Sequence, residues 1–142
     1  MASSSAPINP LVGIAITQKL SKANHSIWKA QVLAVFRGSR LVGHLTGATA
    51  APDEEIDGEV DGKEVKLPNP AYDEWYARDQ QVLSFILSSL SKEVMTQVAA
   101  KETAVQAWSV IETMFSSQTR ARVVNTRLAL ATRDESGSDR SG

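Results

Sequence analysis

A stripe of large apolar side chains at helical spacing runs through residues 71–90 and constrains the fold more than any other feature of the sequence. The side chains recur every three or four residues, which places them on one face of a single helix. An amphipathic helix cannot bury its apolar face alone, so other elements must pack against it. The stripe consists of Tyr72, Trp75, Tyr76, Val82, Leu83, Ile86, Leu87 and Leu90.

Flanking segments repeat this spacing and supply the packing partners. Residues 26–37 end before Gly38, a residue type that commonly terminates helices. A helix is predicted over residues 103–115. At its start Thr103 is followed three residues later by Gln106, a pair that matches the capping box. Shorter helices are predicted over residues 40–45, 91–98 and about 116–132. The side chains expected in the shared core are Trp28, Phe36, Trp75, Leu83, Trp108 and Phe115.

Residues 48–70 interrupt the helical pattern with three prolines and an acidic run. Asp61-Gly62 between two valines is only a weak hairpin signal, so the segment is predicted to be a long acidic loop with at most a small hairpin. Residues 1–12 and 134–142 have the composition of disordered tails, which leaves a single domain over residues 13–133. The predicted fold is therefore all-α, a compact bundle of about five or six short helices with a long acidic loop.

Cysteine is absent, so a thiolate nucleophile, a disulfide and a zinc knuckle are excluded within these 142 residues. His25 and His44 lack further ligands at metal spacing, and both are interpreted as structural residues near helix ends. Phosphate-binding and nucleophile-elbow motifs are also missing. We therefore expect no catalytic residue, metal, cofactor or small-molecule substrate. The chain is interpreted as a non-enzymatic protein of the cytoplasm or nucleus with no membrane segment.

Charge is unevenly distributed although the net charge is only −1. Residues 1–50 contain three Lys, two Arg and no acid, whereas residues 53–66 contain seven acids and two Lys. Residues 118–133 contain four Arg and no acid. Oppositely charged segments of this kind can orient domains as they associate.

Four arginines are the candidates for nucleic-acid contact. On the predicted last helix Arg122 and Arg133 share one side, while Arg120 and Arg127 share another. No aromatic residue is interleaved with them, so stacking of single-stranded bases is not supported. Arg122 and Arg133 are kept as a weak nucleic-acid contact, and RNA is expected to bind weakly if at all.

Asp79 interrupts the apolar stripe of residues 71–90. A carboxylate buried among apolar side chains needs a partner. Two alternatives follow: Asp79 forms a buried ion pair with Arg120 or Arg127, or it caps the start of a neighbouring helix. Either role is structural.

Several features occur in a characteristic order along residues 11–133. They are Asn24 with Trp28, the Leu41–Leu45–Gly47 turn, Trp75 with Asp79, Ser89-Leu90-Ser91, Thr103-Ala104 with Trp108, and Phe115-Ser116-Ser117. In this combination the chain resembles the N-terminal part of Gag from copia-type LTR retrotransposons of plants.

The resemblance implies a capsid-like helical domain that self-associates into particles around the RNA of the element. Its implied partners are other copies of itself or Gag-like chains. In that family a second helical region and often a Cys/His zinc knuckle follow, and this chain contains no knuckle. Two functions stay open: a Gag-type structural module acting through self-association or protein–protein contacts, and a stand-alone adaptor or RNA-associated protein derived from such a Gag.

Overall fold

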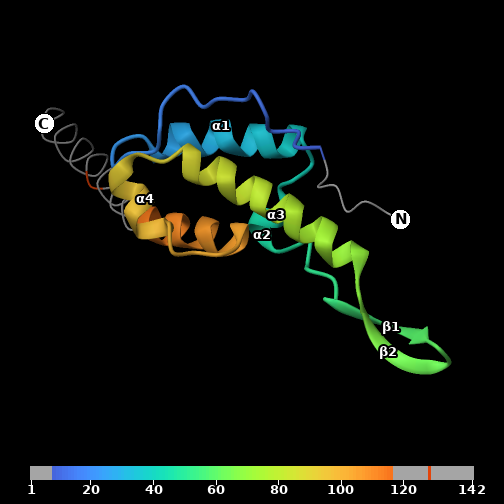
Figure 1. The fold of residues 1–142 in the computed structure, drawn as a ribbon. Coiled ribbons are helices and arrows are strands. Elements are labelled where there is room, and N and C mark those ends of the chain that lie inside the picture. Colours follow the sequence, from blue (N-terminus) through green and yellow to red (C-terminus); the bar gives the residue numbers. More distant parts are fainter. Residues whose placement is uncertain (1–7, 117–127, 129–142) are drawn as a thin grey trace, which may run out of the picture. The chain divides into compact units, whose positions relative to one another are not determined.

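The computed structural model describes residues 8–116 and Leu128. The chain divides into two compact units, residues 1–109 and residues 110–142. In chain order the elements are α1 (His25–Gly38), α2 (Gly43–Thr46), β1 (Glu55–Val60), β2 (Lys63–Pro68), α3 (Pro70–Ser88) and α4 (Lys92–Val98) (Figure 1). A further helix begins at Ala104, and its described residues run to Ser116.

The turn before α1 is organised by the side chain of Asn24. Its Oδ1 accepts a hydrogen bond from the Ser21 backbone N–H at 2.8 Å, and its Nδ2 donates to the Lys19 carbonyl at 2.9 Å. This turn starts α1 in the orientation that turns its apolar stripe inward. The buried residues of that stripe are Trp28, Val32 and Phe36.

α1 ends in a Schellman motif whose left-handed residue is not the expected glycine. The Leu41 N–H donates to the Phe36 carbonyl at 2.8 Å, and the Arg40 N–H donates to the Arg37 carbonyl at 3.2 Å. Arg40 has a φ of 60°, a conformation that glycine adopts most readily. Gly38 is instead the last residue of the helix itself.

The all-α prediction is wrong, because residues assigned to an acidic loop form an antiparallel hairpin. β1 and β2 pair along all six residues of each strand. Asp61 and Gly62 connect them with φ values of 53° and 76°. Two positive φ values are what a type I′ hairpin turn requires, and Asp-Gly is one of its preferred sequences. The protein therefore combines helices with a two-stranded sheet, and the hairpin extends from the start of α3 away from α1 (Figure 1).

α3 begins one residue earlier than the sequence predicts because Asn69 and Pro70 form its start. Asn69 Oδ1 accepts a hydrogen bond from the Ala71 N–H at 3.1 Å. Pro70 lacks an N–H, which at this position of a helix would have had no partner inside the helix. Tyr76 is 48% exposed, so the buried stripe is narrower near the start of the helix than the sequence suggests.

The segment before α1 packs onto the end of α3 as an extended arm. Leu20 forms a parallel bridge with Leu90, and its N–H donates to the Ser89 carbonyl at 2.8 Å. Leu20 is fully buried, and Leu11 is buried as well. The packed part of the chain thus begins before residue 13, where the sequence analysis places the domain boundary.

Aromatic side chains from distant parts of the sequence form the centre of the first unit. The rings of Trp28 and Trp108 are stacked with centroids 5.7 Å apart, and Phe36 meets the edge of Phe85 at 5.4 Å. The indole Nε1 of Trp28 donates to the Ser89 carbonyl at 3.2 Å, so the polar end of this buried ring has a partner.

Five of the six expected core side chains are buried, namely Trp28, Phe36, Leu83, Trp108 and Phe115. Trp75 differs, since it is only half-buried. Its Nε1 donates to the Thr49 carbonyl at 2.8 Å, which holds the ring at the side of the first unit instead of inside the Trp28 cluster.

In the second unit the described residues are 110–116 and Leu128. Ile111 and Phe115 are buried, as their helical spacing predicts. The predicted last helix over residues 116–132 lies outside the described residues, apart from Ser116 and Leu128, which are both helical.

Candidate functional site

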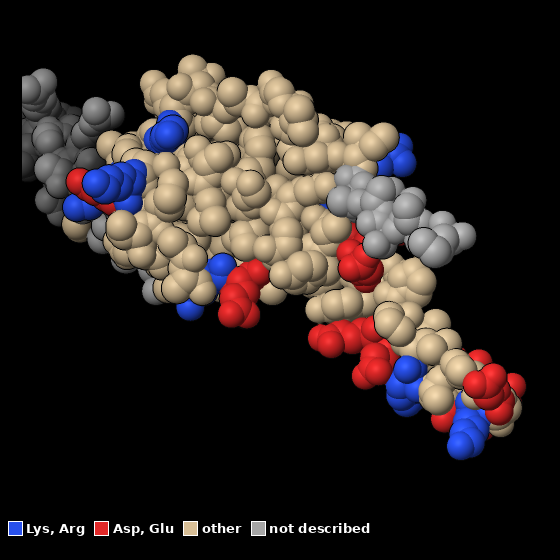
Figure 2. Space-filling view, viewed as in Figure 1, with Lys and Arg blue, Asp and Glu red and all other residues tan. Residues whose placement is uncertain are grey.

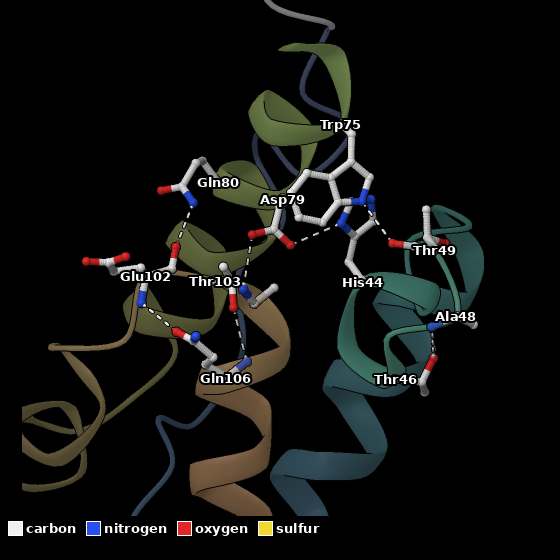
Figure 3. Close-up of polar contacts among 11 residues, drawn as sticks. His44, Thr46, Ala48, Thr49, Trp75, Asp79, Gln80, Glu102, Thr103 and Gln106 are labelled. Atoms are coloured by element: carbon white, nitrogen blue, oxygen red, sulfur yellow. Dashed lines mark hydrogen bonds and ion pairs between the residues drawn. The ribbon is translucent and has the colours of Figure 1, made fainter. Parts of the chain in front are cut away.

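Asp79 of α3 and His44 of α2 form a buried pair (Figure 3). The Asp79 Oδ1 and His44 Nδ1 atoms are 3.1 Å apart, and the two side chains are 2% and 5% exposed. An ionised carboxylate only accepts hydrogen bonds, so His44 Nδ1 carries the proton and donates to Asp79.

The second oxygen of Asp79 caps a helix. Its Oδ2 accepts a hydrogen bond from the Ala104 N–H at 3.2 Å. Ala104 is the first residue of the next long helix, and its N–H has no acceptor within that helix. This is the helix-capping alternative that the sequence analysis describes for Asp79. The other alternative concerns Arg120 and Arg127, which lie outside the described residues.

Gln80 strengthens the same junction from the neighbouring position on α3. Its Nε2 donates to the Glu102 carbonyl at 2.9 Å. The Glu102 N–H in turn donates to Gln106 Oε1 at 3.2 Å, and the Gln106 N–H donates to Thr103 Oγ1 at 3.4 Å. Thr103 and Gln106 therefore form a cap close to the predicted capping box, except that the glutamine reaches the N–H of Glu102.

A tight turn after α2 positions the ring that covers the pair. Gly43, the first residue of α2, lets this turn pack closely, because a Cβ on it would lie 2.0 Å from Thr49 Oγ1 and force that side chain to move. The turn directs the Thr49 carbonyl toward the indole N–H of Trp75, and the Trp75 ring stacks on His44 with centroids 5.6 Å apart (Figure 3). Trp75 thus shields one side of the imidazole from water.

Together these contacts make a polar junction between α2, α3 and the helix that begins at Ala104. Both carboxylate oxygens of Asp79 have donors from the protein, which is how a buried charge is normally accommodated. From the sequence, Asp79 is expected to face inward, whereas His44 is expected only to suit the dipole at a helix end. One sequence signal could have shown that His44 is buried. It shares helical spacing with the apolar residues Leu41 and Leu45, so its ring faces the core as theirs do.

The hairpin is the second distinctive feature and has two unlike faces. Along β1 the acidic residues alternate with uncharged ones, so that Glu55, Asp57 and Glu59 share one face. Glu59 lies opposite Glu64, a like-charged pair that weakens the ribbon, while Asp57 forms an ion pair with Lys66. Figure 2 shows acidic and basic atoms concentrated on the hairpin, whereas most of the visible helical surface is uncharged.

Among residues 8–116 no cluster of three or more His, Asp or Glu side chains could hold a metal ion. His25 is half-buried and stacks near Trp28 with ring centroids 6.2 Å apart. The arginines named as nucleic-acid candidates, Arg122 and Arg133, lie outside the described residues.

No helix in the described part of the chain combines the length and the apolar character needed to cross a membrane.

Comparison with known proteins gives a consistent result. A family model described as the gag-polypeptide of LTR copia-type matches residues 32–137. In Arabidopsis thaliana the chain is 31% identical over 116 residues to the "Retrovirus-related Pol polyprotein from transposon RE2" and 29% identical over 119 residues to that from transposon RE1. These matches cover 82% and 84% of this chain but only 8% of each relative. No solved structure matches the chain.

Proposed function

Because the chain belongs to the gag-polypeptide family of copia-type LTR retrotransposons, we propose that it is a Gag-type module that assembles by binding further copies of itself and other Gag-like chains. Membership in the family confirms the resemblance seen in the sequence and gives the chain a structural role of the Gag type. The proposal adds that this role is carried out through protein–protein contacts and not through catalysis by its own residues.

The separation of charge within the first unit is the observation that supports assembly most directly. The described residues from 8 to 50 contain no acid, and Lys22, Arg37 and Arg40 are exposed. The acidic residues of β1 are exposed on the hairpin. Two copies can therefore set a basic surface against an acidic one, and such exposed charges mainly steer encounter and fix register.

Light scattering of the purified chain over a range of concentration and salt tests the proposal. We expect reversible association that weakens as salt rises, because charges on exposed surfaces are screened beyond about 8 Å at physiological ionic strength. Association that persists or strengthens in high salt would mean that apolar surfaces dominate the contact. Both results support assembly and distinguish its two physical causes.

A chain that remains strictly monomeric up to millimolar concentration, in low and high salt alike, would contradict assembly by this region. A mobility shift of RNA by that monomer in low salt would then favour the adaptor function that the sequence analysis keeps as its alternative.

A further inference from the structure

The hairpin carries apolar side chains that remain open to water on one face. Ile56 is 42% exposed and Val60 is 49% exposed. Between them lies Gly58, and the Leu67 side chain crosses it so closely that a Cβ on Gly58 would lie 2.2 Å from Leu67 Cδ1. A two-stranded hairpin is only marginally stable in water unless it packs against another element. The hairpin therefore becomes more stable when a partner covers this apolar face.

The acidic residues of the hairpin restrict what that partner is. Glu55 and Glu59 lie on the opposite face of β1 and are exposed. A surface packed on one face of a sheet lies about 10 Å from it, which is comparable to the screening length of about 8 Å, so these carboxylates still act on a partner that covers the apolar face. The favoured partner surface is thus apolar at its centre and basic at its edges.

The outward side of α1 has this combination. Ile27 is 58% exposed although it lies on a helix whose other face is fully buried. Ala30 and Ala34 follow on the same outward side and are also exposed, so a second backbone can approach closely. Lys22 precedes the helix and Arg37 lies in its last turn, and both are exposed.

We propose that the hairpin of one copy docks on the outward face of α1 of the next copy. The inference rests on the proposed self-association and names the two surfaces that carry it. The surfaces differ from each other and every chain has both, so the contact is head-to-tail and repeats into a ring or an open chain. A symmetric contact between two hairpins would instead bring their acidic residues together, which is unfavourable.

Two charge-reversed chains test this arrangement. The hairpin variant carries Glu55→Lys with Glu59→Lys, and the second substitution also relieves the like-charged pair with Glu64. The helix variant carries Lys22→Glu with Arg37→Glu. Circular dichroism and thermal melting establish that both variants fold, and sedimentation velocity at low salt measures their association. Lys92→Glu with Lys101→Glu is the control for the helix variant, since it makes the same change in net charge as that variant at exposed positions around α4.

Each variant alone should associate at least about tenfold more weakly than the wild-type chain, a difference that corresponds to about 1.4 kcal/mol. An equimolar mixture of the two should regain association, because the basic hairpin of the first variant then faces the acidic α1 of the second, and the unchanged hairpin of the second faces the unchanged α1 of the first. The control chain should associate as the wild type does.

Three results would overturn the inference. If either variant alone associates as strongly as wild type, or if the mixture regains nothing, the docking surfaces are wrong although the Gag-type module can still assemble through other surfaces. A monomeric wild-type chain at every concentration would remove both this contact and the proposed function.

Discussion

Replacing Asp79 by alanine would leave two buried donors without an acceptor. The His44 Nδ1–H and the Ala104 N–H both donate to this carboxylate, at 3.1 and 3.2 Å. A buried donor deprived of its partner costs about 1–3 kcal/mol, and more when the lost acceptor is a charged group; here two donors lose their acceptor at once. We therefore expect Asp79→Ala to lower the free energy of unfolding by about 3–5 kcal/mol, a large part of the ~5–15 kcal/mol typical of a domain.

Urea unfolding followed by tryptophan fluorescence measures this loss. Asp73→Ala is the matched control, because Asp73 lies on the same helix, in its first turn, but is exposed. It should cost less than about 1 kcal/mol, the usual value for an acid interacting with a helix start. The loss of free energy of unfolding caused by Asp79→Asn should lie between those of Asp79→Ala and Asp73→Ala. The amide oxygen of Asn can still accept from the Ala104 N–H, but its NH2 group would face the Nδ1–H of His44, and two donors cannot bond to each other.

A double-mutant cycle then isolates the pair itself. The His44→Ala substitution removes one donor, so the loss caused by Asp79→Ala should be smaller in that background than in the wild type. If Asp79→Ala changed the free energy of unfolding by less than about 0.5 kcal/mol, the range of ordinary surface substitutions, the carboxylate could not be what joins α2, α3 and the helix from Ala104.

Three further predictions follow from the fold. Arg40→Gly should raise the free energy of unfolding by about 1 kcal/mol, because glycine adopts the left-handed conformation without the penalty of a Cβ; an unchanged or lower value in urea unfolding would contradict this account of the helix end. Trp108→Ala should cost about 3–5 kcal/mol, as expected for emptying a buried aromatic site beside Trp28, and a melting temperature equal to that of wild type would show that this stack contributes little. Partial burial and the hydrogen-bonded, negatively charged Glu54 raise the pKa of the Tyr72 hydroxyl above its ordinary value. In a Tyr76→Phe background Tyr72 is the one tyrosine left, and spectrophotometric titration should then show that Glu54→Gln lowers this pKa. An equal pKa with and without Glu54 would exclude the carboxylate as a cause.

Helical periodicity predicted the elements whose stripes are regular. The i, i+4 and i+8 spacing of Trp28, Val32 and Phe36 is buried in α1, and the stripe of residues 71–90 became α3. The hairpin was underestimated for a physical reason. Along β1 acids alternate with small or apolar residues, which adds a strand pattern to the signal of the Asp61-Gly62 turn. Seven acids within residues 53–66 outweighed that signal and suggested a loop.

The junction at Asp79 could be predicted only in part. Its position inside an apolar stripe shows that it needs a partner, and Thr103 with Gln106 shows that a helix starts nearby in the sequence. Which donor reaches it depends on how α2 packs against α3, across 35 positions of sequence between His44 and Asp79. Periodicity carries no information about such distant pairs. Trp75 was misplaced for the same reason, because its partner, the Thr49 carbonyl, lies 26 positions away in an irregular turn.

The stacking of Trp28 on Trp108 has a consequence for how the chain folds during synthesis. The partners of α1 are made late, because Ser89 lies 61 positions and Trp108 lies 80 positions after Trp28. At about 5–20 residues per second, a ribosome needs roughly 4–16 s to add those 80 residues. Phe85, which meets Phe36, is made within that interval, so the inner face of α1 is at first uncovered and then only partly covered until Trp108 is made. Contacts this distant in sequence also close slowly. The nascent chain therefore presents Trp28 and Phe36 to chaperones, or to neighbouring nascent chains on the same messenger RNA, before its own core can enclose them.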